Sequence, residues 1–193
     1  MLECNKWFIC IVYITENVAV SVRISNEGWA WFVCGRRLLV WQCKQTEDGR
    51  RRVVNSQCRE LTLPSSDLAY RAELVVIFCT PGSQVPSCIA ASPEGIVRYW
   101  PNIGHEGSSF EMNAELQGQE CDSLTDISHI GCILATTTAT IVLVQPQISS
   151  GRHSITCRPL KLPQGWLGGI SKLIPSIIFG SLQSSHIMET VSI

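Results

Sequence analysis

The chain has 193 residues, with 15 Lys and Arg against 16 Asp and Glu for a formal net charge of −1, 45% hydrophobic residues and only 16% charged ones. This length allows one domain and part of a second, and the near-neutral charge excludes a general electrostatic attraction to nucleic acid. The hydrophobic content excludes disorder throughout the chain, and no apolar run reaches the roughly 18 residues that a membrane-spanning helix requires.

The N-terminal part of the chain combines a short apolar run with flanking charges. Residues 7–14 are apolar throughout, but Glu3 and Glu16 lie on either side of them. Because the preceding stretch is not clearly basic and no small-residue cleavage site follows, a secretory signal is not predicted. We treat residues 1–17 as an atypical N-terminal segment, and the composition favours a cytoplasmic or nuclear location.

The ten cysteines are scattered along the chain and form no C-x-x-C pair, so the spacing of a metal-binding knuckle is absent. Several lie inside apolar runs, as Cys34 and Cys79 do. In such a run a thiol behaves as a small buried hydrophobe. We therefore predict reduced, buried thiols, and we expect neither a metal site nor a cofactor.

A hairpin pattern occurs three times along the chain. Each copy combines β-branched and aromatic residues with glycine or proline at or near the reversal, which is typical of paired antiparallel strands. The strands of these hairpins are predicted at residues 28–34 and 38–41, at 87–91 and 96–100, and at 131–135 and 141–144.

The spacing of the hairpins indicates a repeat. They end at Trp41, Trp100 and Val144, about 59 and then about 44 residues apart, which is the length of four-stranded propeller blades. Further strands are predicted at residues 18–24, 74–79, 124–130 and 155–160. Residues 18–161 are therefore predicted to be all-β, an incomplete β-propeller of about three to three and a half blades, with Trp41 and Trp100 packed between blades. A small β-sandwich is the alternative.

An incomplete propeller has a structural consequence. Closed rings contain about four to eight blades, and each blade covers an apolar face of its neighbour. We therefore expect an uncovered blade face and open strand edges, which favour binding to a partner.

Residues 162–185 follow a different pattern, with a helical period and an apolar stripe. Glycine and serine occupy most of the opposite side, where Lys172 is the only charge. A helix with so little intrinsic stability folds only where its stripe is buried, for example on loosely packed, curved lipid. The predicted membrane-binding residues are Leu162, Trp166, Leu167, Ile170, Leu173, Ile174, Ile177, Ile178, Phe179 and Leu182.

Two other interpretations of this segment remain open. An apolar stripe at helical spacing is often part of a protein core, or it lies in a groove on a partner. Pro175 weakens any helical interpretation because it removes an internal hydrogen bond. The last residues, 186–193, are predicted to begin a further strand.

Signals for catalysis are weak. His105, His129, His153 and His186 show no metal-ligand spacing, and nothing in the sequence places the Cys121 thiol within reach of a base. Residues 168–172 lack the order of a phosphate-binding loop. The arginines at residues 36–37 and 50–52 are interpreted as solvated turn residues rather than as a nuclear-import or nucleic-acid patch. No catalytic residue is predicted.

Several motifs carry a family resemblance over residues 18–182. The segments at residues 20–24, 28–31, 61–67, 95–101 and 162–165 resemble, in order, the N-terminal propeller of the vertebrate one-hundred-and-thirty-three-kilodalton nucleoporins. The resemblance implies a seven-bladed propeller followed by an α-helical stack within the Y-shaped scaffold complex of the nuclear pore. It also implies that the loop at residues 162–182 senses lipid packing. Residues 1–17 do not resemble the family.

The sequence thus leads to one functional hypothesis and one alternative. The resemblance implies a non-enzymatic nucleoporin fragment that associates peripherally with the curved nuclear envelope and supports pore assembly, and through it mRNA export and protein transport. Other scaffold nucleoporins of the Y-complex are its implied partners, although the contact with the stem of that complex lies outside this chain. The alternative is a soluble propeller-type interaction module without a membrane role.

Overall fold

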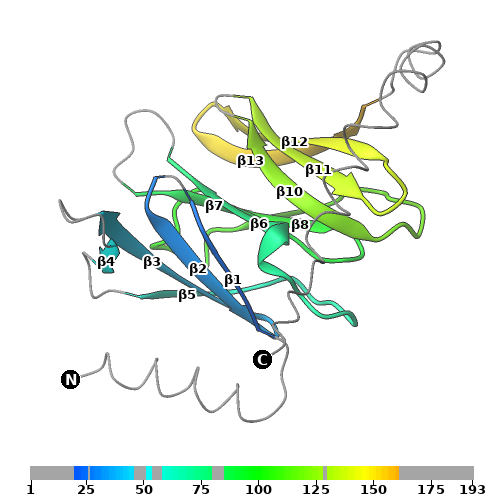
Figure 1. The fold of residues 1–193 in the computed structure, drawn as a ribbon. Coiled ribbons are helices and arrows are strands. Elements are labelled where there is room, and N and C mark those ends of the chain that lie inside the picture. The colour runs from blue at the N-terminus through cyan, green and yellow to red at the C-terminus, as the bar shows by residue number, and fades with distance from the viewer. Residues whose placement is uncertain are drawn as a thin grey trace, which may run out of the picture. The chain divides into compact units, whose positions relative to one another are not determined.

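The computed structural model describes residues 20–25, 27–45, 51–53, 58–79, 85–127 and 130–160. Within these residues the fold is all-β apart from one short 3₁₀ helix. The strands form three antiparallel sheets that follow one another along the chain (Figure 1). We call these sheets blades 1, 2 and 3.

Blade 1 is built around the first predicted hairpin. Its strands pair in the order β1-β2-β3, and the outer edge of β3 is shared by β4 and β5. Because β4 pairs with the far end of β3 and β5 with its beginning, the fourth strand of this blade is interrupted. The strands are β1 (Val20–Ile24), β2 (Trp29–Cys34), β3 (Arg37–Gln45), β4 (Arg51–Val53) and β5 (Arg59–Thr62).

Blade 2 contains the second predicted hairpin and has four strands in sequential order, β6-β7-β8-β9. The turn between β7 and β8 has Gly95 at a φ of 96°, a conformation that favours glycine. The elements are η1 (Ala72–Leu74), β6 (Val75–Phe78), β7 (Ser87–Ala91), β8 (Ile96–Trp100) and β9 (Phe110–Asn113).

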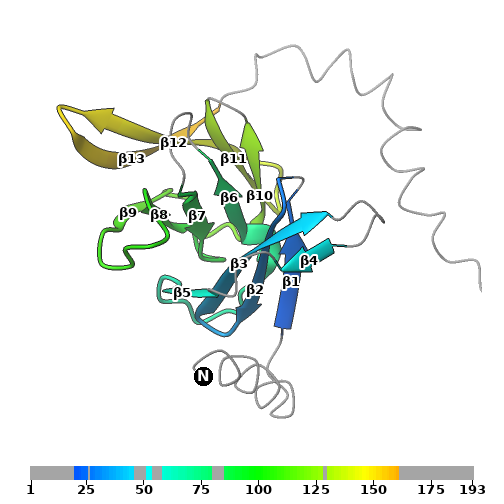
Figure 2. The ribbon, with the colours of Figure 1, turned by 90° about the vertical axis from the view of Figure 1, so that its left-hand side faces the viewer.

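Blade 3 repeats this order with β10 (Cys121–Ile127), β11 (Gly131–Thr136), β12 (Ile141–Ser149) and β13 (Arg152–Pro159). The last two strands are longer than β11, so they continue beyond it as a two-stranded ribbon (Figure 2). Gly131 opens β11 at a φ of 139°, where a Cβ atom would lie 2.3 Å from the carbonyl oxygen of Val144. Only glycine allows that close approach of the two strands.

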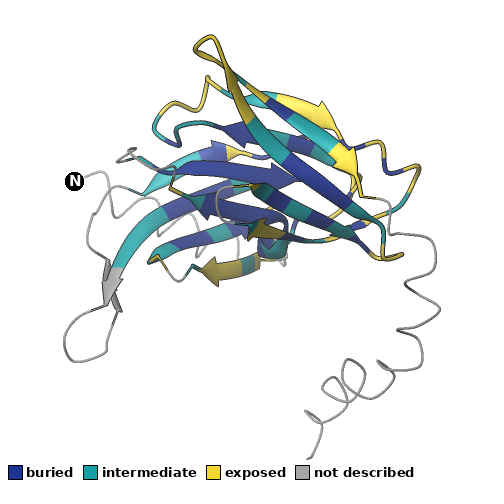
Figure 3. Cartoon of the chain, turned by 90° about the horizontal axis from the view of Figure 1, so that it is seen from above, coloured by how far each residue is buried: buried dark blue, intermediate teal, exposed yellow. Residues whose placement is uncertain are grey.

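Apolar side chains join the blades face to face in two core clusters. One cluster lies between blades 1 and 2 and includes Trp31, Leu38 and Trp100. The other lies between blades 2 and 3 and includes Ile89, Tyr99 and Leu134. The buried residues accordingly run along the central strands (Figure 3). This stacking of four-stranded sheets confirms the predicted propeller-type arrangement, whereas a sandwich has only two facing sheets.

The predicted hairpins correspond to β2–β3, β7–β8 and β11–β12, and the predicted flanking strands to β1, β6, β10 and β13. The strand β10 begins at Cys121 rather than at residue 124. The strands β4, β5 and β9 were not predicted. Arg51 and Arg52, interpreted as turn residues, lie in β4, and Arg37 is the first residue of β3. One further prediction was wrong: Cys79 is exposed, because it lies just beyond the end of β6 rather than within the sheet.

Candidate interaction site

Blade 2 shows what a fully covered blade looks like. Every residue of its strand β7 is buried. Successive side chains of a strand point to opposite faces of the sheet. Cys88 and Ala90 accordingly pack toward blade 1, while Ile89 and Ala91 pack toward blade 3. A central strand of a blade with a neighbour on each side is therefore apolar on both faces, as residues 88–91 of β7 are.

Blade 1 has a neighbour on one face only among the described residues. Trp31, Val33 and Leu38 point toward blade 2. Val20, Val22 and Ile24 point the other way, and their exposed fractions are 41%, 63% and 45%. We call the surface formed by these three residues, with Phe32 and Trp41 beside them, the outer face of blade 1. Its exposed part is the edge strand β1, because Ala30, Cys34 and Leu39 on the same face of the central strands are buried. Large exposed aliphatic side chains on one sheet face are typical of an interaction surface.

The opposite end of the stack has a second such surface. On β11, Cys132 and Leu134 are buried against blade 2, whereas Ile133 and Ala135 on the other face are only half-buried. Ile141 lies beside Ala135 and is also half-buried. These half-buried residues form the outer face of blade 3, which has no covering blade in the described residues.

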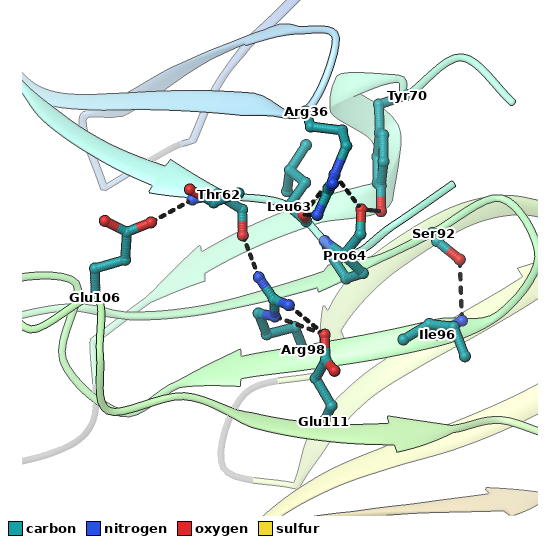
Figure 4. Close-up of polar contacts among 10 residues, drawn as sticks. All are labelled: Arg36, Thr62, Leu63, Pro64, Tyr70, Ser92, Ile96, Arg98, Glu106 and Glu111. Atoms are coloured by element: carbon teal, nitrogen blue, oxygen red, sulfur yellow. Dashed lines mark hydrogen bonds and ion pairs between the residues drawn. The ribbon is translucent and has the colours of Figure 1, made fainter. Parts of the chain in front are cut away.

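A polar network fixes the connection between blades 1 and 2. The Arg36 guanidinium, in the turn between β2 and β3, donates hydrogen bonds to the carbonyl oxygens of Leu63 at 3.0 Å and Pro64 at 3.1 Å. The Tyr70 hydroxyl also donates to Pro64, at 2.9 Å (Figure 4). Burial, reinforced by the nearby charge of Glu94, raises the pKa of Tyr70. The phenol therefore stays protonated and remains a donor.

Glu94 holds the same connection from the turn between β7 and β8. Its Oε1 accepts hydrogen bonds from the Ser66 hydroxyl at 2.8 Å and from the backbone N–H groups of Asp67 at 3.0 Å and Leu68 at 3.3 Å. Partial burial raises the pKa of Glu94, but these hydrogen bonds outweigh it and hold the pKa below its ordinary value. Glu94 is thus ionised and orders the connection.

Arg98 of β8 and Glu106, in the connection between β8 and β9, join blade 2 to the outer strand β5 of blade 1. The Arg98 guanidinium donates to the carbonyl oxygen of Thr62 and pairs with Glu111, while Glu106 accepts the Thr62 N–H at 2.9 Å (Figure 4). Both backbone groups of this residue in β5 are therefore satisfied by blade 2. The network closes part of a strand edge that is otherwise available for pairing with another chain.

The inner strands of blades 1 and 2 are joined by hydrogen bonds around η1. The Trp31 indole N–H donates to the carbonyl oxygen of Ala72 at 3.0 Å, and the Ser21 hydroxyl accepts the Ala72 N–H at 2.9 Å. Together with the outer contacts of Arg98, they fix the orientation of blade 1 on blade 2 at both ends of the interface. The two blades therefore form one rigid support for the outer face of blade 1.

Buried thiols line the interior of the stack. Burial raises the pKa of Cys121 to about 12 and that of Cys157 to about 11. Burial likewise raises the pKa of Cys88 and Cys132, which lie in the two core clusters. A thiol that does not ionise is a poor nucleophile and metal ligand. Cys88, Cys121 and Cys132 are buried and confirm the prediction that cysteines act as small hydrophobes in this fold, whereas Cys157 is half-buried.

The predicted site residues have different outcomes. All ten predicted membrane-binding residues, from Leu162 to Leu182, lie outside the described residues and stay predictions; His129 and His186 lie outside them as well. Trp100 is fully buried between blades 1 and 2, as predicted. Trp41 lies on the outer face of blade 1, so no described blade covers it. His153 packs near Tyr99 and Phe110, between blades 2 and 3.

Among the residues that the structure describes, no group of three or more His, Cys, Asp and Glu side chains is arranged to hold a metal ion. No helix in that part of the chain is long and apolar enough to cross a bilayer. The contacts of Arg36, Glu94 and Arg98 were not predicted, because the sequence shows these residues only as polar members of turns and strands.

Four-stranded blades stacked through apolar faces define a propeller-type domain, the class of protein to which this fold belongs. Comparison with known families gives the particular member of that class. Residues 15–192 match the model described as Nup133 N terminal like. The chain therefore belongs to the Nup133 N-terminal-like family.

Individual relatives agree with this assignment. The chain is 39% identical to the nuclear pore complex protein Nup133 of Drosophila melanogaster over 172 residues, which cover 83% of this chain and 14% of that protein. It is 35% identical to Nup133 of Danio rerio over 163 residues, 82% of this chain and 14% of that protein. Identity to human Nup133 is 28% over 181 residues, 90% of this chain and 15% of that protein. The chain thus spans about one seventh of these relatives.

Proposed function

We propose that this chain is a structural component of the nuclear pore complex and acts as a non-enzymatic scaffold at the nuclear envelope. The observation that carries this proposal is the family match over residues 15–192, together with relatives that are named as nuclear pore complex proteins. The stacked blades support it, because their apolar outer faces suit assembly with further protein. Other scaffold nucleoporins of the Y-complex are the proposed partners, and pore assembly, mRNA export and protein transport are the proposed downstream roles.

The location can be tested directly in cells. The full chain carrying a fluorescent tag is expected at the nuclear rim, in register with a nuclear pore marker. An equally expressed control that carries the tag alone should be diffuse. A diffuse distribution of the tagged chain would contradict the scaffold role.

The proposed role includes a contact with curved membrane through residues 162–182. The support is their asymmetry in sequence: large apolar residues along one side, and glycine, serine and a single lysine along the other. Such a segment gains little from headgroup charge, so its binding depends on access to loosely packed acyl chains. Trp166 and Phe179 are the largest side chains available for insertion, and Lys172 adds a weak attraction.

Liposome flotation of the full chain tests this membrane contact. We expect binding to small neutral vesicles and weak binding to large ones. Burying an isoleucine contributes about 1.5–3 kcal/mol, so Ile174→Asp is expected to reduce binding by about tenfold or more. Ile148→Asp is the matched control, because Ile148 is 66% exposed on the ribbon of blade 3 and lies outside the stripe. Equal flotation of both variants would refute the membrane role and favour the soluble interaction module.

A further inference from the structure

The ribbon formed by β12 and β13 has two open edges within the described residues. β11 pairs with β12 only as far as Val144, whereas β13 follows β12 to Ser149 (Figure 2). β13 is also the last strand of blade 3, so no described strand pairs with its outer edge. An open edge presents backbone N–H and C=O groups to which a further extended chain can add.

The hydrogen bonds of the ribbon show which backbone groups of β13 face outward. The N–H of Leu160, just after β13, donates to the carbonyl oxygen of Ile141 at 2.8 Å. In an antiparallel pair, residues that bond the partner strand alternate with residues whose N–H and C=O groups point away from it. Every second residue counted back from Leu160 therefore bonds β12. The intervening residues His153, Ile155 and Cys157 direct their backbone groups to the outer edge.

Proline blocks one of the two edges. Pro146 of β12 lies opposite Ile155, at a position whose backbone groups point away from β13. It has no N–H to offer there, so this edge of the ribbon is unsuited to a further strand. β13 contains no proline before Pro159, its last residue. Its outer edge is therefore open over the three alternating residues from 153 to 157.

The strand with the open edge is positively charged. Arg152 and Arg158 are the only Lys, Arg, Asp or Glu residues in the range 141–159. Both are exposed, and neither forms an ion pair with another described residue. They are six residues apart, so they lie on the same face of β13, about 20 Å from each other. A strand added to this edge would have both cations within reach of its own side chains.

We propose that the outer edge of β13 binds an extended acidic segment of a partner protein, which adds antiparallel to blade 3 as a fifth strand. Backbone hydrogen bonds hold the segment, and acidic residues six positions apart on it pair with Arg152 and Arg158. Charge favours this partner over a second copy of the chain. Two β13 strands paired antiparallel about Ile155 would place Arg152 opposite Arg158, and like charges directly opposite each other are destabilising. This contact does not depend on residues 162–182.

Fluorescence anisotropy of the full chain with a labelled synthetic peptide tests the charge selection. The probe has nine alternating valine and threonine residues with glutamate at positions 2 and 8, and the same peptide with lysine there is its control. We expect the glutamate peptide to bind at least about tenfold more tightly. Arg152→Glu combined with Arg158→Glu should reverse this preference, which also shows that the variant is folded. Arg23→Glu is the matched control, because Arg23 is exposed on the edge strand β1; it should leave the preference unchanged.

Backbone methylation of the glutamate peptide tests the strand pairing. When its two glutamates lie opposite the two arginines, the N–H groups of its odd positions face β13 and those of its even positions face away. N-methylation at positions 3, 5 and 7 should therefore abolish binding, whereas N-methylation at positions 4 and 6 should not.

The other outcomes overturn the proposal. Equal binding of the two methylated peptides would show charge attraction without strand pairing. Equal binding of the glutamate and lysine peptides, or no binding of either, would show that the edge does not select an acidic strand. Binding of phosphatidylserine vesicles through the two arginines, with no binding of the peptide, would assign this surface to lipid headgroups instead.

Discussion

Replacement of Trp100 gives the sharpest test of the packing between blades 1 and 2. Its side chain is fully buried in the core cluster that joins these blades, with the Arg98 guanidinium 5.7 Å from the ring centroid. A tryptophan buries about 150–250 Å² of surface, and at about 25 cal/mol per Å² this area is worth roughly 4–6 kcal/mol at most. Measured replacements of buried aromatic residues by alanine cost about 3–5 kcal/mol. We expect Trp100→Ala to destabilise the chain by that amount.

A second replacement at the same position separates volume from polarity. The Trp100 indole N–H is buried and has no hydrogen-bond partner in the structure. A buried donor without a partner costs about 1–3 kcal/mol. Trp100→Phe removes that donor and keeps most of the ring, so the gain offsets the smaller volume. We expect its free energy of unfolding to stay within about 1 kcal/mol of the unsubstituted chain.

Urea unfolding followed by far-ultraviolet circular dichroism measures both effects, because this signal does not depend on the tryptophan that is removed. Ile148→Ala is the control and should change stability by less than about 0.5 kcal/mol, since its side chain is 66% exposed. If Trp100→Phe costs as much as Trp100→Ala, the argument about the unpaired N–H is wrong. If Trp100→Ala costs no more than the control, the interface between blades 1 and 2 is not part of the cooperative core.

Two further predictions concern the turns. In Gly131→Ala the added Cβ atom would lie 2.3 Å from the carbonyl oxygen of Val144. In Gly118→Ala, also at a positive φ, the added Cβ atom would have no atom within 4 Å. In Gly118→Ala, conformational strain should lower the free energy of unfolding by about 1–2 kcal/mol. In Gly131→Ala, the close contact should lower it by about 1–3 kcal/mol more. Equal melting temperatures for the two variants would contradict this. Because the pKa of Glu94 is lowered in the folded state, its stabilising effect is present above its ordinary pKa of 4.5 and is lost as the pH falls through the folded value. The difference in unfolding midpoint between the unsubstituted chain and Glu94→Gln should therefore be present at pH 7 and shrink below about pH 4; a difference that is constant with pH would refute the ionised contact.

Much of the fold follows from local sequence. The three hairpins combine β-branched and aromatic residues with a reversal, and these signals act over only a few residues. They therefore gave the bounds of β7 and β8 and the existence of β2, β3, β11 and β12. The repeat also predicted stacked blades, because a sheet with an apolar face requires a neighbour. The strands β5 and β9 were missed because they lie at outer edges and consist largely of polar residues, so hydrogen bonds to the next strand, rather than an apolar pattern, define them.

The sequence by itself determined the strands with apolar patterns, their repeat and the family, as well as the asymmetry of residues 162–182 on which the membrane hypothesis still rests. Only the tertiary structure decided which face of each blade is covered. Trp41 and Trp100 end equivalent hairpins, yet Trp100 is fully buried because blade 1 lies against it, whereas Trp41 faces a side that no described blade covers. The contact of Arg98 with Thr62 likewise joins residues far apart in the chain. Burial and long-range hydrogen bonds depend on which neighbour a surface meets, and local sequence carries no information about that neighbour.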